Sequence, residues 1–218
     1  WATRTVEESP SFIIAASKVM SLFCLHREWT MAELWISSQG PHASSVGSAG
    51  SGAVAASGSN GFTNSRPPGG TSSDGHDLGS LHLGSCLFRD PGVVARDAGL
   101  AAFVATARAH ILSPDVGIIG RVWSSMRPDW VTGINNRQIF VRSKEASLAG
   151  LQTCFALPIA VGGRVEAVVV FYDKKHRAQD NTCLEVAMRL TWALGNAVGA
   201  KRASLLQQEQ DEHASQST

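Results

Sequence analysis

The stretch that most constrains the fold is 153–172 (TCFALPIAVGGRVEAVVVFY), in which Gly162-Gly163 joins two apolar runs. A Gly-Gly pair adopts positive φ at both positions without Cβ strain, as the tight turns that match strand twist require. The flanks, Thr153–Val161 and Arg164–Tyr172, are rich in β-branched and aromatic residues, which favour strands. Both faces of the second flank are mostly apolar. We therefore predict a β-hairpin at the centre of a sheet that is covered on both sides.

Strand alternation assigns the second flank to two faces. One face is expected to carry Val165, Ala167, Val169 and Phe171, and the other to carry Glu166, Val168, Val170 and Tyr172. Glu166 and Glu33 are isolated carboxylates in predicted strands, and exposure to solvent is the less costly expectation for both.

Composition limits the class of protein. The chain has 218 residues, of which 44% are hydrophobic and 17% are charged, and its formal net charge is +1. A net charge this close to zero predicts that the chain binds neither nucleic acid nor an anionic membrane. The four cysteines show no CxxC spacing, which favours free thiols in a reduced, cytoplasmic setting. No apolar run approaches the ~20 residues of a membrane span, and the start at Trp1 favours a segment of a longer polypeptide.

The N-terminal part predicts a helix over Thr5–Glu28 with Ser9-Pro10 at its start, then a strand over Trp29–Ser37. Between about 38 and 80 the chain is rich in Ser and Gly and poor in large apolar side chains, so we expect a disordered insertion between two neighbouring strands. The remaining predicted elements are a strand (Leu81–Phe88), a helix (Asp97–Ile111), a Gly117/Gly120 turn before a short helix (Arg121–Met126), a strand (Trp130–Ile134), a small helix (Ser143–Gly150), a long helix (Asn181–Gln207) and a polar tail or linker (208–218).

From Gly117 onward the residues themselves resemble a GAF domain. The segments that carry the resemblance are GIIGRVWSSMRPDWV, Phe140-Val141-Arg142, Ala149-Gly150-Leu151, Phe155-Ala156-Leu157-Pro158-Ile159 and VEAVVVFY. With Trp29–Ile36, which is similar to the family's first strand, the resemblance covers about 12–202 when the insertion is skipped. Ser143 and Leu157 depart from the usual pattern without disturbing the fold. The resemblance implies a single α+β domain over 1–207: a GAF/PAS-like central antiparallel sheet of about five to six strands, with helices on both sides and a long C-terminal helix.

The resemblance also implies a ligand pocket on one face of the sheet. The residues expected to face it are Trp123, Trp130, Ile134, Phe140, Arg142, Ala146, Leu151, Phe155 and Val169. Arg142 suits a planar anion, with a surface ion pair or a helix-capping role as its alternative, and the other eight are alternatively core residues. The sequence lacks the residues typical of cyclic-nucleotide, bilin and methionine sulfoxide reductase members, so the ligand and any cofactor stay unknown.

No catalytic or metal-binding arrangement stands out, so we expect no enzyme activity, although a small redox enzyme using Cys154 or Cys86 is a remote alternative. The leading hypothesis is a sensory or regulatory domain of a larger cytoplasmic signalling protein. It binds a small molecule or a partner and relays a change to neighbouring domains through its terminal helices. We expect a homodimer through the last helix, along a seam of Ala187, Leu190, Leu194 and Ala197. The alternative is a ligand-free structural dimerisation module.

Overall fold

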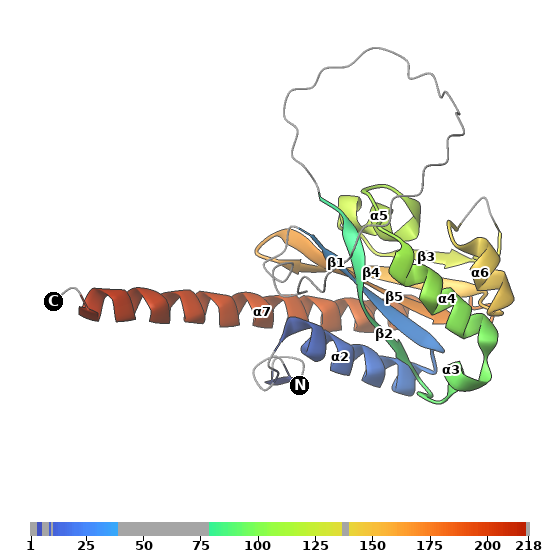
Figure 1. Cartoon of the computed structure of the whole chain (residues 1–218), viewed down its shortest axis with the longest axis horizontal. Helices are drawn as coiled ribbons and strands as arrows, with labels where there is room; N and C mark the ends of the chain where they lie inside the picture. Colours follow the sequence, from blue (N-terminus) through green and yellow to red (C-terminus); the bar gives the residue numbers. More distant parts are fainter. Residues whose placement is uncertain (1–3, 6–8, 10, 39–78, 137–139, 217–218) are drawn as a thin grey trace, which may run out of the picture.

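The computed structural model describes residues 4–5, 9, 11–38, 79–136 and 140–216 (Figure 1). The insertion predicted at about 38–80 lies, except for residues 38, 79 and 80, outside the described residues. The elements in chain order are α2 (Phe12–Arg27), β1 (Met31–Ser37), β2 (Leu81–Phe88), α3 (Val93–Arg96), α4 (Ala98–Ala109), α5 (Gly117–Ser125), β3 (Asp129–Thr132), α6 (Ser143–Leu148), β4 (Thr153–Val161), β5 (Arg164–Asp173) and α7 (Asn181–Gln216).

The strands form one five-stranded sheet in the order β2-β1-β5-β4-β3, and every neighbouring pair is antiparallel. The predicted hairpin is confirmed as β4 and β5, with Gly162 at φ 58° and Gly163 at φ 82°. The strands on either side of the insertion, β1 and β2, pair directly, as predicted. The α+β class and the antiparallel sheet are therefore confirmed.

Helices cover both faces of the sheet (Figure 1). On one face α2 and α7 pack against a core that includes Ala32, Leu34 and Ile36 of β1. On the other face α4, α5 and α6 cover a second core that includes Met31 and Trp35 of the same strand. Because successive side chains of a strand point to opposite faces, two apolar cores require strands that are apolar in both phases, and β1, β4 and β5 meet this requirement.

A β-bulge changes the expected faces at the start of β5. Ile159 pairs with Ala167 and Ala160 pairs with Val165, which leaves Glu166 as the extra residue of β5. Val165 consequently packs with the core under α4–α6, and the Glu166 carboxylate is paired with Arg202 of α7. The predictions that Glu166 is exposed and shares a face with Val168 were therefore wrong, because the extra residue inverts the alternation.

Helix boundaries differ from the predictions in three places. Helix α2 begins at Phe12 with Ser11 as its N-cap, rather than at Ser9-Pro10. Helix α5 begins at Gly117, so both glycines of the GxxG motif lie inside the helix and not in a turn before it. Helix α7 continues to Gln216, nine residues beyond the predicted end at Gln207, and its last part projects away from the sheet (Figure 1). Among the described residues, no helix combines the length and the apolar character needed to cross a membrane.

Candidate functional site

The structure divides the nine predicted ligand-binding residues between the two faces of the sheet. Those that belong to the core under α4–α6 are Trp123, Ile134, Phe140, Arg142, Ala146 and Leu151. Those that pack on the opposite face, towards α2 and α7, are Trp130, Phe155 and Val169. The expectation that all nine line one pocket was therefore wrong, because Phe155 and Val169 occupy the strand phase that points to the other core.

Arg142 and Glu33 form a buried ion pair beneath α4–α6. Arg142 is the N-cap residue of α6 and Glu33 lies in the middle of β1, with exposed fractions of 3% and 0%. Arg142 Nη1 donates to Glu33 Oε1 at 3.0 Å, and Nη2 donates to Oε2 at 2.6 Å. This two-pronged geometry is the strongest form of guanidinium–carboxylate contact. The prediction that Glu33 is exposed was wrong, and Arg142 has an ion-pair partner inside the chain.

Two further side chains complete the hydrogen bonding of this pair. The Tyr172 hydroxyl accepts from Arg142 Nη2 at 2.9 Å and donates to Glu33 Oε2 at 2.9 Å. Trp35 Nε1 also donates to Glu33 Oε2, at 3.0 Å. A buried charge is costly unless it is paired and hydrogen-bonded, and Glu33, Arg142, Tyr172 and Trp35 together meet this condition. We call these four residues the Glu33 network.

Aromatic rings surround the guanidinium and remove it from water. Arg142 Cζ lies 4.1 Å from the centre of the Phe103 ring and 5.5 Å from that of Trp35. Burial, the largest single effect, lowers the pKa of Arg142, but the charge and hydrogen bonds of Glu33, together with Tyr172 and Cys86, raise it above its ordinary value, so the guanidinium stays charged. Burial, reinforced by the Glu33 charge, raises the pKa of Tyr172 well above its ordinary value, so its hydroxyl stays protonated and can donate.

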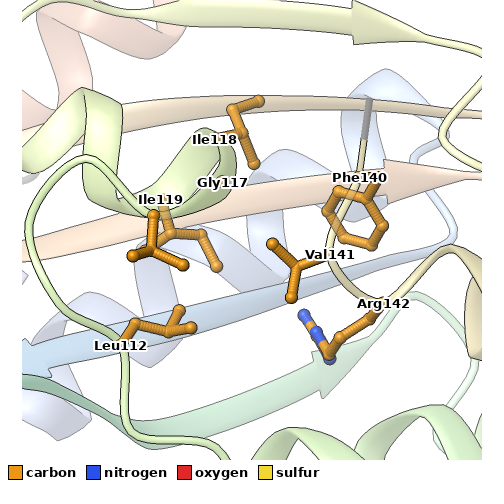
Figure 2. A pocket seen from close by; sticks show the side chains of 8 residues that line it. Leu112, Gly117, Ile118, Ile119, Phe140, Val141 and Arg142 are labelled. Atoms are coloured by element: carbon orange, nitrogen blue, oxygen red, sulfur yellow. The ribbon is translucent and has the colours of Figure 1, made fainter. Parts of the chain in front are cut away.

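The cavity that remains beside the Glu33 network is small. Its lining residues are Leu112, Val116, Gly117, Ile118, Ile119, Phe140, Val141 and Arg142 (Figure 2). The space that it offers to the centre of a water molecule is about 10 Å³, which is roughly what one water needs. Among the described residues, side chains therefore fill most of the space beside the Glu33 network, where the resemblance implies a ligand.

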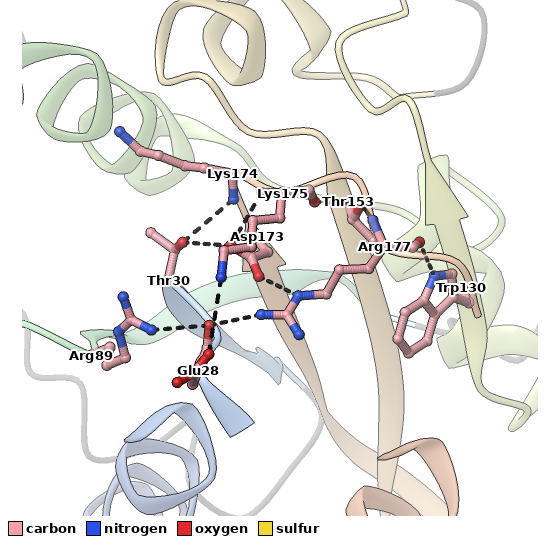
Figure 3. A network of polar contacts seen from close by, with 9 residues as sticks. All are labelled: Glu28, Thr30, Arg89, Trp130, Thr153, Asp173, Lys174, Lys175 and Arg177. Carbon is pink, nitrogen blue, oxygen red and sulfur yellow. Dashed lines mark hydrogen bonds and ion pairs between the residues drawn. The ribbon is translucent and has the colours of Figure 1, made fainter. Parts of the chain in front are cut away.

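A second polar network lies at the other end of β5, around Asp173 (Figure 3). The Asp173 carboxylate accepts from Thr30 Oγ1 at 3.0 Å and forms an ion pair with Arg177. Arg177 Nη2 also donates to the Glu28 carbonyl oxygen at 3.0 Å, and the Arg177 backbone N–H donates to Thr153 Oγ1 at 2.9 Å. The connection from β5 to α7, which the sequence marks as a solvated charge run, is thus fixed to β4, to the end of β5 and to the segment that joins α2 to β1.

An open cleft lies beside this second network, next to the first turn of α7. Its lining residues are Arg27, Trp29, Trp130, Arg177, Ala178, Asp180 and Cys183, and its volume is about 210 Å³. Neither the periodicity nor the resemblance pointed to it, because its residues come from three separate parts of the chain. Two arginines and two tryptophans make it suitable for an anion.

The predicted dimer seam on α7 faces the chain's own sheet. Ala187, Leu194 and Ala197 are buried in the core shared by α2, α7 and the sheet, and Leu190 packs against that core. These four residues therefore cannot form an interface with a second copy, which corrects the prediction. The exposed apolar residues of α7 are instead Met188, Trp192, Leu205 and Leu206.

The four cysteines are free, and none is highly exposed. Burial raises the pKa of Cys24 to about 12, and it also raises the pKa values of Cys86, Cys154 and Cys183. A raised pKa disfavours the thiolate, which is the reactive form. Among the described residues, no group of three or more His, Cys, Asp or Glu side chains could hold a metal ion.

Neither a protein-family model nor a curated protein matches the sequence. Solved structures do resemble the fold. The free methionine-R-sulfoxide reductase of Neisseria meningitidis, in complex with its substrate, has a TM-score of 0.56 at 11% identity, over 93% of this chain and 87% of that chain. The GAF domain of a Coxiella burnetii phosphoenolpyruvate-protein phosphotransferase has a TM-score of 0.53 at 14% identity, over 93% and 91%.

A third similar structure is the GAF domain of A. aeolicus nlh2 in an inactive state, with a TM-score of 0.51 at 15% identity, over 91% of this chain and 89% of that chain. At such identities the likeness concerns the fold alone. By its sheet, its two helical layers and these similarities, the chain has the fold of a GAF domain.

Proposed function

We propose that this chain is a regulatory domain of a signalling protein, which relays a conformational change to a neighbouring domain through α7. The observation that carries the proposal is the division of α7 into two parts. Its first part packs on the sheet through Cys183, Ala187, Leu194 and Val198, whereas every side chain described from position 203 onward is exposed. A change in the domain that moves the first part therefore displaces the projecting part.

Similar structures support this proposal. They include GAF domains of phosphoenolpyruvate-protein phosphotransferases and a domain of a putative two-component sensor histidine kinase from Sinorhizobium meliloti. A relay of this kind requires an input that favours one position of α7 over another, and we propose a small molecule or a protein partner as this input. The raised thiol pKa values support a domain that performs no thiol chemistry, and the free thiols support a cytoplasmic location.

We also propose a homodimer in which the projecting parts of two α7 helices pair. Trp192, Leu205 and Leu206 have exposed fractions of 71%, 51% and 59%, although large apolar side chains gain by leaving water. Leu205 and Leu206 lie on the part of α7 in which every described side chain is exposed. Pairing with a second copy buries them without moving the first part of α7 from the sheet.

The alternative function is a ligand-free structural dimerisation module. The Glu33 network favours it, because the chain's own side chains fill the core under α4–α6 and leave a cavity of about 10 Å³. The two functions differ in whether the purified domain carries or takes up a ligand.

Native mass spectrometry of the 218-residue chain, with a denatured control, tests both functions. We expect a dimer with a bound mass that is lost on denaturation. An apo dimer contradicts a retained small molecule as the input and supports the structural module. A monomer contradicts the pairing of α7 helices. A variant with Leu205→Glu and Leu206→Glu is expected to be monomeric, whereas Gln207→Glu with Gln208→Glu adds the same charge to the same part of α7 and is expected to stay dimeric.

A further inference from the structure

We propose that the cleft beside the first turn of α7 binds a small planar carboxylate. This proposal rests on the proposed function, since it names the site and the chemical class of the small molecule whose binding α7 would relay. The cleft has a volume of about 210 Å³, and liquid water occupies about 30 Å³ per molecule. It therefore has room for a small organic molecule, in contrast to the cavity beside the Glu33 network.

Arg27 supplies a cation without a partner. It is the last residue of α2, its side chain is half-buried in the wall of the cleft, and it makes no hydrogen bond or ion pair within the described part of the chain. A guanidinium presents a rigid fork of donors that matches the two oxygens of a carboxylate. An anion in the cleft can therefore bind Arg27 without breaking a hydrogen bond or an ion pair of the folded chain.

Arg177 supplies a second cation that is already held in place. Its Nε pairs with Asp173 and its Nη2 donates to the Glu28 carbonyl oxygen, while its Nη1 makes no hydrogen bond in the described chain (Figure 3). Its Cζ lies 5.0 Å from the centre of the Trp29 ring, which fixes the plane of the guanidinium. The acidic side chain of the lining, Asp180, accepts from the Cys183 backbone N–H as the N-cap of α7.

Trp29 provides an independent sign of a missing acceptor. Its side chain is 1% exposed, and among the described residues its Nε1 finds no nitrogen or oxygen acceptor. The indole N–H instead interacts with the Cys183 thiol, where it opposes the larger effect of burial on the pKa of that thiol, but sulfur is only a weak acceptor. A buried donor without a proper acceptor costs about 1–3 kcal/mol, and a carboxylate oxygen that takes the place of the Cys183 thiol, which also lines the cleft, supplies a stronger one.

Trp130 makes the site suited to a planar ligand. Its ring stacks on Phe155 at 5.0 Å and meets Trp29 edge-on at 5.4 Å, and its Nε1 donates to the Arg177 carbonyl oxygen at 3.3 Å. These contacts hold the ring rigidly in the wall of the cleft. An aromatic wall beside two arginines favours a carboxylate that is attached to a flat apolar group.

The test is a titration of the whole chain with benzoate, followed by calorimetry and by the fluorescence of the tryptophans. We expect saturable binding with a Kd in or below the millimolar range. Arg27→Gln is expected to weaken binding by about tenfold or more, because it removes charge-assisted hydrogen bonds to the anion. Trp29→Phe, which keeps the packing but removes the donor, is expected to weaken binding by a smaller factor. Arg164→Gln, which removes an exposed arginine at the far end of the sheet, serves as the matched control and is expected to bind as the unmodified chain does.

Any of four results would overturn the proposal. One is the absence of saturable binding of both benzoate and acetate at millimolar concentration. Another is equal affinity of the Arg27→Gln variant, and the third is equal affinity for benzyl alcohol, which lacks the charge. Tighter binding of inorganic phosphate than of benzoate would contradict the carboxylate class. The titration does not depend on α7 pairing, so a dimer that fails to bind benzoate refutes the site alone, and a monomer that binds it refutes the pairing alone.

Discussion

Replacing Arg142 with methionine is expected to lower the free energy of unfolding by about 3–5 kcal/mol, the range for breaking one side of a buried ion pair. Methionine keeps much of the volume but supplies no positive charge. Glu33, with an exposed fraction of 0%, would then be a buried carboxylate with only the Tyr172 and Trp35 donors. Urea unfolding followed by circular dichroism measures the loss.

The control removes the charge of both partners. A variant with Glu33→Leu, Arg142→Met and Tyr172→Phe leaves no buried charge in this core, and apolar replacement of a buried ion pair is often neutral or stabilising. We therefore expect its stability to lie much closer to that of the unmodified chain than that of Arg142→Met does. A loss below about 1 kcal/mol for Arg142→Met alone, within the range of a surface ion pair, would contradict the burial of the pair.

Gly195→Ala is expected to lower the free energy of unfolding by about 1 kcal/mol. A Cβ at Gly195 would lie 2.1 Å from the carbonyl oxygen of Ala160 in β4, a backbone atom that cannot move alone. Overpacking of this kind costs about 1–3 kcal/mol, whereas alanine gains about 1 kcal/mol over glycine inside a helix. The cost of the clash exceeds the gain in helix propensity only if α7 lies as close to β4 as it does in the structure. Thermal or urea unfolding of the variant measures the difference.

Gly199→Ala is the matched control on the same helix, one turn later. A Cβ at Gly199 meets only a methyl group of Val161, at 3.5 Å, which is ordinary contact. This substitution is therefore expected to leave stability unchanged or to raise it by up to about 1 kcal/mol. If both substitutions stabilise the chain alike, α7 does not pack against β4 at Gly195, and the relay through α7 loses its basis.

The sequence alone predicts the hairpin and the β1–β2 pairing well, because both depend on local signals. Gly162-Gly163 fixes the turn, and the apolar character of both faces of β5 requires cover on both sides. The β-bulge at Glu166 carries no such signal, since one extra residue changes no local pattern and yet inverts the face of the residues before it.

The Glu33 network shows more clearly what cannot be predicted from the sequence alone. Glu33 shares its strand phase with Met31 and Trp35, both of which are fully buried, so an acidic residue there requires a buried partner. That much could be inferred from the alternation. The identity of the partner could not, because Arg142 follows Glu33 by 109 positions and reaches it only through the packing of α6 over the sheet.

The prediction of a dimer interface along α7 was wrong for a related reason. The three-to-four spacing of Ala187, Leu190, Leu194 and Ala197 identifies an apolar stripe correctly but does not say what covers it. The stripe packs on the sheet, as in an amphipathic helix of any compact domain. The cleft with Arg27 and Arg177 carries no pattern in the sequence, because its residues are brought together only by the tertiary structure.

The chain's own ion pair, with Tyr172, closes the core under α4–α6, and an alkaline titration of the chain tests this arrangement. Tyr172 is the only tyrosine of the chain, so tyrosinate absorbance reports on this hydroxyl alone. Burial and the Glu33 charge raise its pKa well above its ordinary value of about 10. The unfolded chain therefore releases this proton at lower pH than the folded chain, and the contribution of Tyr172 to stability is complete below about pH 10 and decreases as the pH rises above it.

We predict no tyrosinate signal while circular dichroism shows the native fold, and its appearance together with unfolding at higher pH. Ionisation with a pKa near 10 in the folded chain would contradict this arrangement, because it would place the hydroxyl in water and leave the region under α4–α6 open.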